Sequence, residues 1–193
     1  MAALATTTDV EAVIGRELTG AETPRVERLL EFASAAVRTY IGQVFDRVIE
    51  DAHTFSGPGV YRRLPQRPVV EVVSVVDNGT AIGSDLYSVN VDTGVLVRRR
   101  FDEWSAWTVP SVWVGPTVVT YTHGYLNIPA DVVGVVAEAA ARKFQNPAGV
   151  KQQSLGGWSE TTSTVVDGVQ LTPSEMASLA PYRSVAGPIP LSY

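Results

Sequence analysis

Residues 23–42 read TPRVERLLEFASAAVRTYIG and carry the clearest helix signal in the chain. Thr23 can cap a helix, Pro24 suits its first turn and Gly42 can end it in a left-handed conformation. Apolar side chains recur every three or four residues and form one stripe: Val26, Leu29, Leu30, Ala33, Val37, Tyr40 and Ile41. The charged residues lie largely off this stripe. The spacing therefore predicts an amphipathic helix over 23–41 with one face against a core.

Two shorter helices are predicted near the ends of the chain. The first begins at Thr8 or Asp9 and ends at Ile14, because Thr8 and Glu11 have the spacing of a capping box. The other runs from Thr172 to about Ala180 and combines an N-cap, a proline at the first helical position and a capping-box glutamate.

A second long helix is predicted from Pro129 to about Gln145, and Asn146-Pro147 stops it. Its valines and alanines cover more than one stripe, which is typical of a helix buried on several sides. Gly134 lies within it and costs about 1 kcal/mol relative to alanine. We interpret that cost as a sign that another backbone approaches closely.

The stretch between the two long helices, roughly 53–123, changes to strand patterns. Asn78-Gly79 follows the β-branched run 69–76 and is the strongest short signal for a hairpin. A three-residue loop at 92–94 would place Val91 opposite Val95 and Val89 opposite Val97. A last pair of strands is expected over 111–114 and 117–122.

These patterns predict an α+β fold, in which a helical bundle core carries a small antiparallel β-domain inserted between its two main helices. We place the helical core at 8–50 and 124–183 and the β-domain at 51–123. Residues 146–171, rich in Gly, Ser, Thr and Gln, are predicted to form a long flexible loop, and residues 184–193 a C-terminal arm.

Composition excludes several classes of site. The 193 residues contain no cysteine, so disulfides, thiol nucleophiles and thiolate metal sites are absent. The N-terminus has no signal-peptide pattern, and the most apolar helical run falls short of the about 20 residues that span a bilayer. We therefore expect a soluble protein made in the cytoplasm. With 15 basic and 20 acidic residues the net charge is −5, which disfavours tight sequence-independent DNA binding.

The search for catalytic residues finds little. His53 and His123 are the only histidines, and they can approach each other if both flank the same domain boundary. A metal site would need a further ligand such as Asp51 or Asp46. No HExxH pattern, nucleophile elbow or phosphate-binding loop occurs. We predict no catalytic, metal or cofactor site.

Two residue clusters have a functional and a structural interpretation. The basic concentration is either a phosphate or partner contact or a solvated strand end, and we favour the strand end. Its members are Arg62, Arg63, Arg67, Arg98, Arg99 and Arg100. Trp104, Trp107 and Trp113 form either a sugar-stacking platform or part of a β-domain core, and we favour the core.

The order of the parts resembles the head-to-tail connector adaptors, or head completion proteins, of long-tailed double-stranded DNA phages. The resemblance spans roughly residues 8–183 and rests on the amphipathic helix and on four short stretches: LPQRPV at 64–69, VTYTHGY at 119–125, IPADV at 128–132 and LTPSE at 171–175. The smallest members of that family are nearly all helical, so the β-domain departs from their pattern.

The resemblance implies a ring of copies that matches the twelvefold symmetry of the portal. Such a ring docks beneath the portal protein in the virion neck, extends the DNA channel without binding DNA specifically, involves no membrane, and receives a downstream connector or tail-completion protein. The C-terminal arm would dock on the portal or on the next subunit. The candidate interface residues are Trp158, Tyr182, Arg183, Ile189, Leu191 and Tyr193.

Three alternatives remain open. In the first, the chain is a tail-completion protein or another structural protein of the virion, such as a capsid decoration protein. From a different class, its β-domain is a small carbohydrate-binding module, which should bind glycans as a monomer. From a third, it is a hydrolase that uses His53 and His123, and changing either should abolish its activity.

Overall fold

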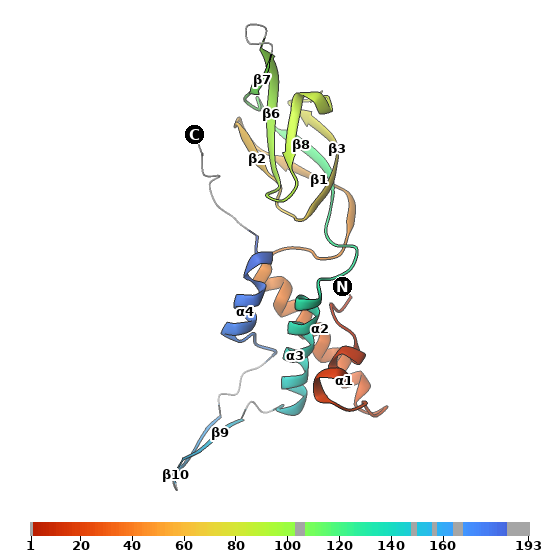
Figure 1. Ribbon diagram of the computed structural model, residues 1–193, viewed down its shortest axis with the longest axis vertical. Coiled ribbons are helices and arrows are strands. Elements are labelled where there is room, and N and C mark those ends of the chain that lie inside the picture. Colours follow the sequence, from red (N-terminus) through yellow and green to blue (C-terminus); the bar gives the residue numbers. More distant parts are fainter. Residues whose placement is uncertain (1, 103–106, 148–149, 156–157, 164–167, 185–193) are drawn as a thin grey trace. The chain divides into compact units, whose positions relative to one another are not determined.

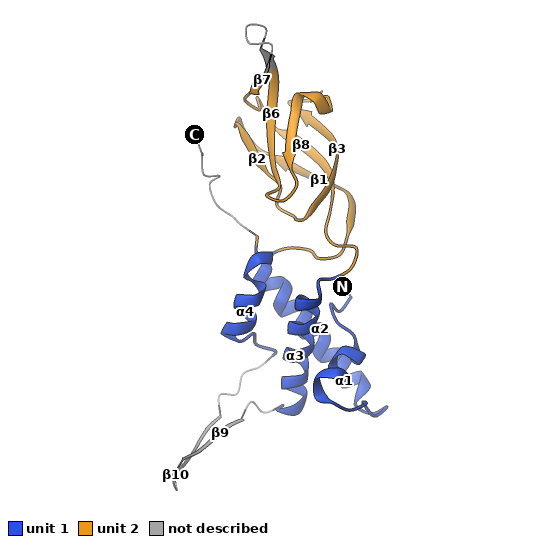
Figure 2. Ribbon diagram, viewed as in Figure 1, with its two compact units in different colours: residues 1–42, 128–183 blue, residues 43–127, 184–193 orange. Residues whose placement is uncertain are grey.

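The computed structural model describes residues 2–102, 107–147, 150–155, 158–163 and 168–184. They form two compact units, which Figure 2 distinguishes by colour. Unit 1 draws its residues from 2–42 and 128–183, and unit 2 consists of 43–127 with Ser184. Helices and antiparallel sheets are both present, so the α+β class is confirmed. Among the described residues no helix combines the length and apolar character that a membrane span requires.

Unit 1 contains four helices (Figure 1): α1 (Thr7–Ile14), α2 (Thr23–Ile41), α3 (Ala130–Gln145) and α4 (Pro173–Leu179). A 3-10 turn, η2 (Ala180–Tyr182), follows α4. Helix α3 packs against the other three, which explains why its buried side chains cover several faces. The core of the unit includes Val10, Val26, Leu30, Val37, Val132, Val136 and Leu179.

The bounds of the helices agree with the sequence patterns, but two caps do not. Helix α1 is capped by Thr6, whose side chain accepts from the Asp9 amide while the Asp9 carboxylate accepts from the Thr6 amide. The predicted Thr8–Glu11 capping box is therefore wrong. Asp9 takes the place of the usual glutamate in this capping box, and Glu11 instead accepts a hydrogen bond from the Leu18 amide at 2.8 Å.

The N-cap of α2 also differs from the prediction. Glu22 occupies that position, and Thr23 is already helical. The Glu22 carboxylate accepts hydrogen bonds from the amide and hydroxyl of Thr19 at 3.0 and 2.9 Å and pairs with Arg16 at 2.8 Å. Those contacts, chiefly with Arg16, lower the pKa of Glu22 to about 2. The chain before the helix is thus held by a carboxylate rather than by a threonine cap.

Gly134 is not explained by a close backbone. A Cβ added there would meet nothing within 4 Å, so our interpretation of this glycine is wrong within the chain. Gly124 shows what such an approach looks like. Its φ is +88°, and an added Cβ would lie 2.4 Å from the carbonyl oxygen of Asp46. Only glycine fits that position without a shift of the backbone.

Unit 2 contains two antiparallel sheets. The first has the order β1-β8-β3-β4, formed by β1 (Val48–Phe55), β8 (Thr117–His123), β3 (Val69–Asp77) and β4 (Thr80–Ala81). The second has the order β2-β6-β5, formed by β2 (Tyr61–Arg63), β6 (Val95–Asp102) and β5 (Tyr87–Asn90), and β7 (Trp107–Pro110) also pairs with β6. A 3-10 turn, η1 (Ser84–Leu86), precedes β5. Residues of both sheets share one core: Leu64, Val69, Val75, Leu96, Trp113, Val119 and Tyr121.

The boundaries of unit 2 lie at 43 and 127, outside the predicted 51 and 123. Strand β1 begins at Val48, and the rings of Phe45 and Tyr125 stack with centroids 6.0 Å apart. The backbone amide of Tyr125 also donates to the carbonyl of Phe45 at 2.8 Å. These contacts join the two connecting segments, which follow Gln43 and precede Ile128, to each other within unit 2.

One hairpin has the predicted turn, and the next has a shifted register. Asp77 pairs with Thr80 across Asn78-Gly79, so the predicted hairpin is confirmed. In the β5–β6 hairpin, however, Asn90 lies opposite Val95 and Val89 opposite Leu96. The predicted register is wrong by one residue. The loop takes four residues, 91–94, and this register accompanies a fully buried Leu96.

The predicted strand pair around Gly115-Pro116 does not form. Strand β8 instead lies in the centre of its sheet, paired with β1 on one side and β3 on the other. Trp113 makes only an isolated bridge with Gly59. Pairing with two distant strands leaves β8 no edge for the segment that immediately precedes it.

A β-hairpin occupies part of the segment predicted to be a flexible loop, 146–171. Strand β9 (Val150–Leu155) pairs antiparallel with β10 (Trp158–Ser163), with Trp158 opposite Leu155. β-Branched residues within both strands, few charges and Gly156-Gly157 between them are typical of a hairpin sequence. The composition that indicated a loop is equally that of a polar hairpin.

Candidate assembly surfaces

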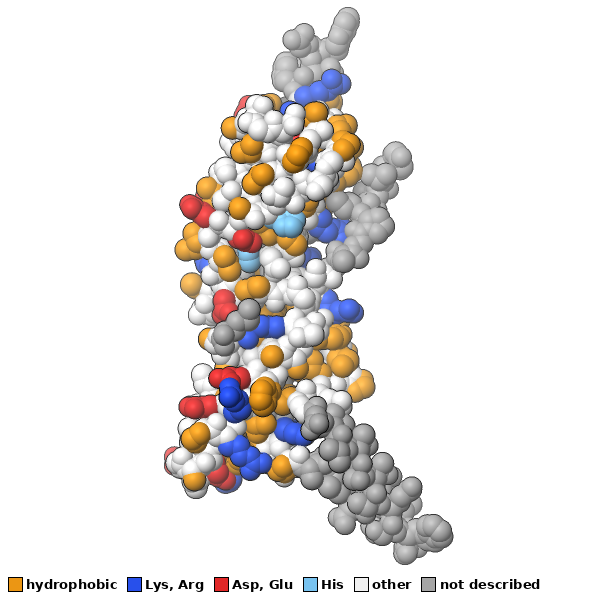
Figure 3. Space-filling view, turned by 180° about the vertical axis from the view of Figure 1, so that it is seen from behind, with side chains coloured by type: hydrophobic (Ala, Val, Ile, Leu, Met, Phe, Trp, Pro, Cys, Tyr) orange, Lys and Arg blue, Asp and Glu red, His pale blue; other side chains and the backbone are white. Residues whose placement is uncertain are grey.

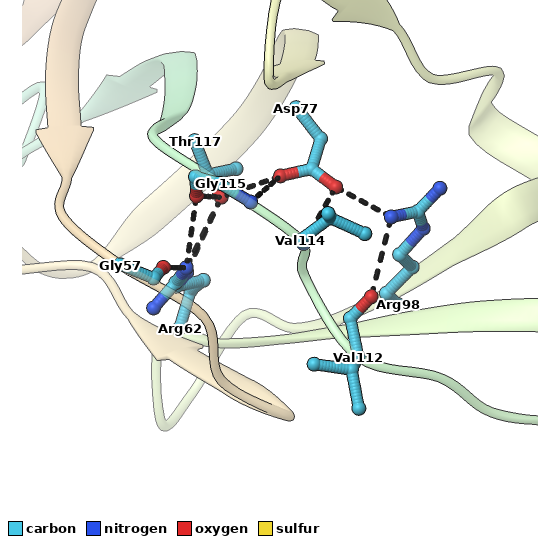
Figure 4. Close-up of polar contacts among 8 residues, drawn as sticks. All are labelled: Gly57, Arg62, Asp77, Arg98, Val112, Val114, Gly115 and Thr117. Carbon is cyan, nitrogen blue, oxygen red and sulfur yellow. Dashed lines mark hydrogen bonds and ion pairs between the residues drawn. The ribbon is translucent and has the colours of Figure 1, made fainter.

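Asp77 is the centre of a polar network inside unit 2 (Figure 4). Its side chain is 3% exposed and accepts hydrogen bonds from the amides of Val114 at 3.0 Å and Gly115 at 3.4 Å and from the hydroxyl of Thr117 at 3.1 Å. It also forms an ion pair with Arg98. Burial raises the pKa of Asp77, but these donors outweigh burial and leave the pKa below its ordinary value.

Arg62 extends the same network from strand β2. Its guanidinium donates to the carbonyl oxygens of Gly57 and Gly115 and to the Thr117 hydroxyl, which lies 3.3 Å away. Burial lowers the pKa of Arg62, and the nearby charge of Asp77 opposes that shift. Arg62 and Asp77 together tie the loop before β2 to the start of β8.

Part of the basic concentration is therefore structural. Arg62 is buried, Arg98 is held by Asp77 and lies 5.8 Å from the ring centroid of Trp113, and the Arg99 guanidinium donates to Ser88. For Arg62 and Arg98 the prediction of a solvated strand end is wrong, because both side chains satisfy groups inside the unit. On the face in Figure 3, Lys and Arg side chains are scattered rather than gathered into one stripe.

The two histidines do not approach each other. His53 lies opposite Val119 in the β1–β8 register, and Val119 is four residues from His123 along β8, which corresponds to about 13 Å. His123 is 1% exposed, and its Nε2 lies 3.2 Å from a carboxylate oxygen of Asp51. Within the described part of the chain, no group of three His, Asp or Glu residues is placed to hold a metal ion.

Of the three tryptophans considered for sugar binding, the structure describes the side chain of Trp113 alone. Trp113 is fully buried in the core of unit 2, which supports the structural interpretation for this residue. Trp104 lies outside the described residues, and the structure describes only the backbone of Trp107, in β7. A sugar-stacking platform would therefore have to form without Trp113.

Two of the predicted interface residues, Tyr182 and Arg183, follow α4 and hold it to the rest of unit 1. The Tyr182 hydroxyl donates to both carboxylate oxygens of Asp131 on α3, at 2.9 and 2.7 Å. The Arg183 guanidinium lies 5.0 Å from the ring centroid of Tyr40 on α2, and the Tyr40 hydroxyl donates to the Met176 carbonyl at 3.1 Å. The chain thus leaves the helices from an anchored point.

An ion pair strengthens the same attachment. Arg142 on α3 makes two hydrogen bonds to the carboxylate of Glu175 on α4, at 2.7 and 3.0 Å, and Glu175 is buried. Glu175 also closes the capping box of α4 with Thr172. Burial raises the pKa of Glu175, but the hydrogen bonds from Arg142 and Thr172 outweigh it and hold the pKa below its ordinary value.

For the other four predicted interface residues, the structure describes no side-chain contacts. Trp158 begins β10, and nothing is described of its side chain. Ile189, Leu191 and Tyr193 lie outside the described residues. The structure therefore brings Tyr182 and Arg183 together at the end of η2 and leaves the roles of the remaining four as predictions.

Sequence reasoning missed one surface residue. Phe32 on α2 is 51% exposed, and the guanidinium of Arg28 lies 5.8 Å from its ring centroid. The sequence does contain a signal for it. Phe32 is a large apolar residue of the helix that does not belong to the apolar stripe, so it must point away from the core that the stripe builds.

Comparisons with known proteins add a limited finding. No protein-family model and no curated protein sequence matches the chain. Among solved structures, the chain is similar to one from the neck of an empty GTA particle, computed with C6 symmetry. The TM-score is 0.48 and the sequence identity 16%, over 94% of this chain and 90% of that chain. A likeness of this degree does not assign a function to the chain.

Proposed function

We propose that this chain is a structural subunit of a phage head-to-tail connector. Copies form a ring that matches the twelvefold portal, lies beneath it in the virion neck, extends the DNA channel and receives the next connector or tail-completion protein. The observation that carries the proposal is the assembly of three sequence segments into one helical unit. The segments 24–42, 128–147 and 171–183, which carry most of the resemblance, contribute α2, α3 and α4 to unit 1 despite the strands between them.

The surface of unit 1 supports a role in subunit contacts. Helix α2 has its stripe of Val26, Leu30 and Val37 in the core and exposes Phe32 on its outer side. Covering a half-exposed phenylalanine with a neighbouring subunit removes apolar surface from water and therefore favours association. We assign α2 and α3 to the subunit core and to part of the contact between neighbouring copies.

The charge distribution supports a channel through which DNA passes without specific binding. The net charge is −5, and two members of the basic concentration, Arg62 and Arg98, are engaged inside unit 2. DNA-binding surfaces instead present several free cations that neutralise phosphates. A ring of such subunits holds DNA weakly and allows it to slide.

The anchored end of α4 supports a role for the arm. Tyr182 and Arg183 fix the point from which residues 184–193 leave unit 1. That segment contains apolar residues and no charged side chain, a composition suited to docking on a protein surface. We assign it to a contact with the portal or the next subunit, and Trp158 to a second contact.

Co-sedimentation with the portal ring of the same phage tests the proposal. The purified chain is expected to move with the portal at a saturating ratio of one chain per portal subunit, and to remain in the slow fraction when the portal is left out. A chain that stays slow with the portal at every concentration, while circular dichroism shows it folded, contradicts the proposal. That result favours the tail-completion or carbohydrate-binding alternatives.

A further inference from the structure

Among the described residues, strand β1 is a long, free edge of the first sheet of unit 2. In the order β1-β8-β3-β4 it pairs on one side only, with β8. The strand at the opposite edge, β4, has two residues, whereas β1 has eight. The free side of an edge strand presents unpaired backbone N–H and C=O groups, and these are a template for a further strand.

Only the second half of that edge is open to regular pairing. A bulge lies between Val48 and Asp51, and Glu50 within it has a φ of +55°. The carboxylates of Glu50 and Asp51 and the bulge protect this half against a foreign strand. From Ala52 to Phe55 the pairing with β8 is regular and adds one residue at a time.

Two side chains of the open half are only partly covered. His53 and Phe55 are half-buried, and their rings meet edge to face with centroids 4.6 Å apart. Phe55 packs against the core of unit 2. Ala52 and Thr54, which alternate with them, are exposed. A strand added beside β1 would cover His53 and Phe55 with every second side chain.

The sequence of residues 185–193, VAGPIPLSY, suits such a strand. Its two prolines, Pro188 and Pro190, are two residues apart, so in an extended chain both remove an N–H from the same side. Gly187, Ile189 and Leu191 keep their N–H groups on the opposite side. The segment can therefore pair along one side only, as the outermost strand of a sheet does.

We propose that residues 185–193 of one copy add as a strand to β1 of a neighbouring copy, over residues 52–55. Ile189 and Leu191 then lie beside His53 and Phe55. This inference rests on the proposed ring, in which each copy contacts the next head to tail. Nine extended residues reach about 30 Å.

Engineered cysteines test the contact between copies, because the natural chain has none. One chain carries Ser192→Cys, and a second chain with a different tag carries Ala52→Cys or Thr54→Cys. They are mixed with the portal ring, and also alone at high concentration, under mild oxidation. We expect a disulfide between the two tagged chains in at least one pairing. The matched control is Thr80→Cys, an exposed position at the opposite edge of the same sheet, and it should give none.

Two proline substitutions test whether the contact is strand pairing. Gly187→Pro, in the Ser192→Cys chain, removes an N–H from the side that pairs and should lower the disulfide yield about fivefold, the effect of one lost hydrogen bond. Ala186→Pro is the control because it removes an N–H from the opposite side, and it should leave the yield unchanged. Equal losses from both substitutions overturn the proposed pairing.

The same samples, with one further chain that carries both cysteines, separate this inference from the proposed function. Sedimentation reports whether rings form on the portal, and the disulfide reports where the arm lies. Rings without the disulfide overturn the arm contact and leave the connector function standing. A disulfide that forms only within a chain carrying both Thr54→Cys and Ser192→Cys, and never between chains, also overturns it, because the arm then docks on its own copy.

Discussion

At the scale of single residues, Asp77 connects parts of unit 2 that are distant in sequence. Its carboxylate joins strand β3 to Arg98 on β6 and to the backbone just before β8. Breaking a buried ion pair leaves the partner charge without compensation, which is more costly than the pair itself is favourable. Removing Asp77 should therefore destabilise unit 2 by more than the intact ion pair stabilises it.

We predict that Asp77→Ala lowers the free energy of unfolding of unit 2 by about 3 kcal/mol. Urea denaturation followed by tryptophan fluorescence measures it, because Trp113 lies in the core of that unit. Asp92→Ala is the control, since Asp92 is exposed in the β5–β6 loop and should change stability by less than about 0.5 kcal/mol. Equal effects of the two substitutions would show that the network contributes nothing.

The ion pair between Arg142 and Glu175 predicts how the stability of unit 1 depends on pH. The folded pKa of Glu175 lies below its ordinary 4.5, so the pair stabilises the fold fully above that value. The contribution is lost as the pH falls through the lowered folded pKa. Helical circular dichroism in urea, followed from pH 6 to pH 3, should show declining stability, and Arg142→Gln should flatten the decline. An unchanged slope in that variant would contradict the assignment.

At the scale of elements, Gly134 tests the packing of α3. The helix has open space where a Cβ would lie, and alanine favours a helix over glycine by about 1 kcal/mol. Gly134→Ala should therefore stabilise the isolated chain by about that amount in thermal unfolding. Gly124→Ala, whose Cβ would meet the Asp46 backbone, should destabilise it. A loss of stability in Gly134→Ala would mean that α3 is packed more tightly than the structure indicates.

Trp158 lies in the β9–β10 hairpin, and we predict that it contributes to assembly. A tryptophan that anchors an interface typically costs tenfold or more in affinity when truncated, so Trp158→Ala should raise the concentration for half-maximal assembly on the portal about tenfold. Its unfolding curve should remain that of the wild type. Ser159→Ala, the adjacent position in β10, is the matched control and should assemble normally. Normal assembly of Trp158→Ala would remove this residue from the interface.

Elements whose signals are local were predicted well from the sequence. The bounds of α2 follow from its apolar period and from Gly42, which has a φ of +70°. The Asn78-Gly79 hairpin follows from its turn residues. The β5–β6 register and the central place of β8 were not predicted, because both depend on pairing between distant segments. Period-2 patterns say which side chains share a face but not which strand lies alongside.

The candidate interface residues show the same contrast between local signals and contacts that depend on the fold. Tyr182 and Arg183 stood out in the sequence, but their partners, Asp131 and Tyr40, are far away along the chain and only the fold brings them together. The basic residues were recognised as a group, whereas the inward direction of Arg62 depends on Thr117. Phe32 carried a signal that pattern analysis of the stripe alone would have revealed.

At the scale of the whole molecule, the two units have different proposed roles. Unit 1 contains the helices and the anchored start of the arm, and unit 2 contains two sheets, one of which has a free strand edge among the described residues. A ring needs each copy to offer two different surfaces to its two neighbours. We propose that the arm and the β1 edge provide one such pair and that the outer side of α2 contributes to another.

Negative-stain imaging of the portal, with and without this protein, decides whether the protein is a connector subunit. We expect an additional layer stacked on one end of the portal, with the same axis and twelve copies. The layer should disappear when the protein is omitted. Portal particles that remain bare beside folded, unbound protein would show that the protein is not such a subunit.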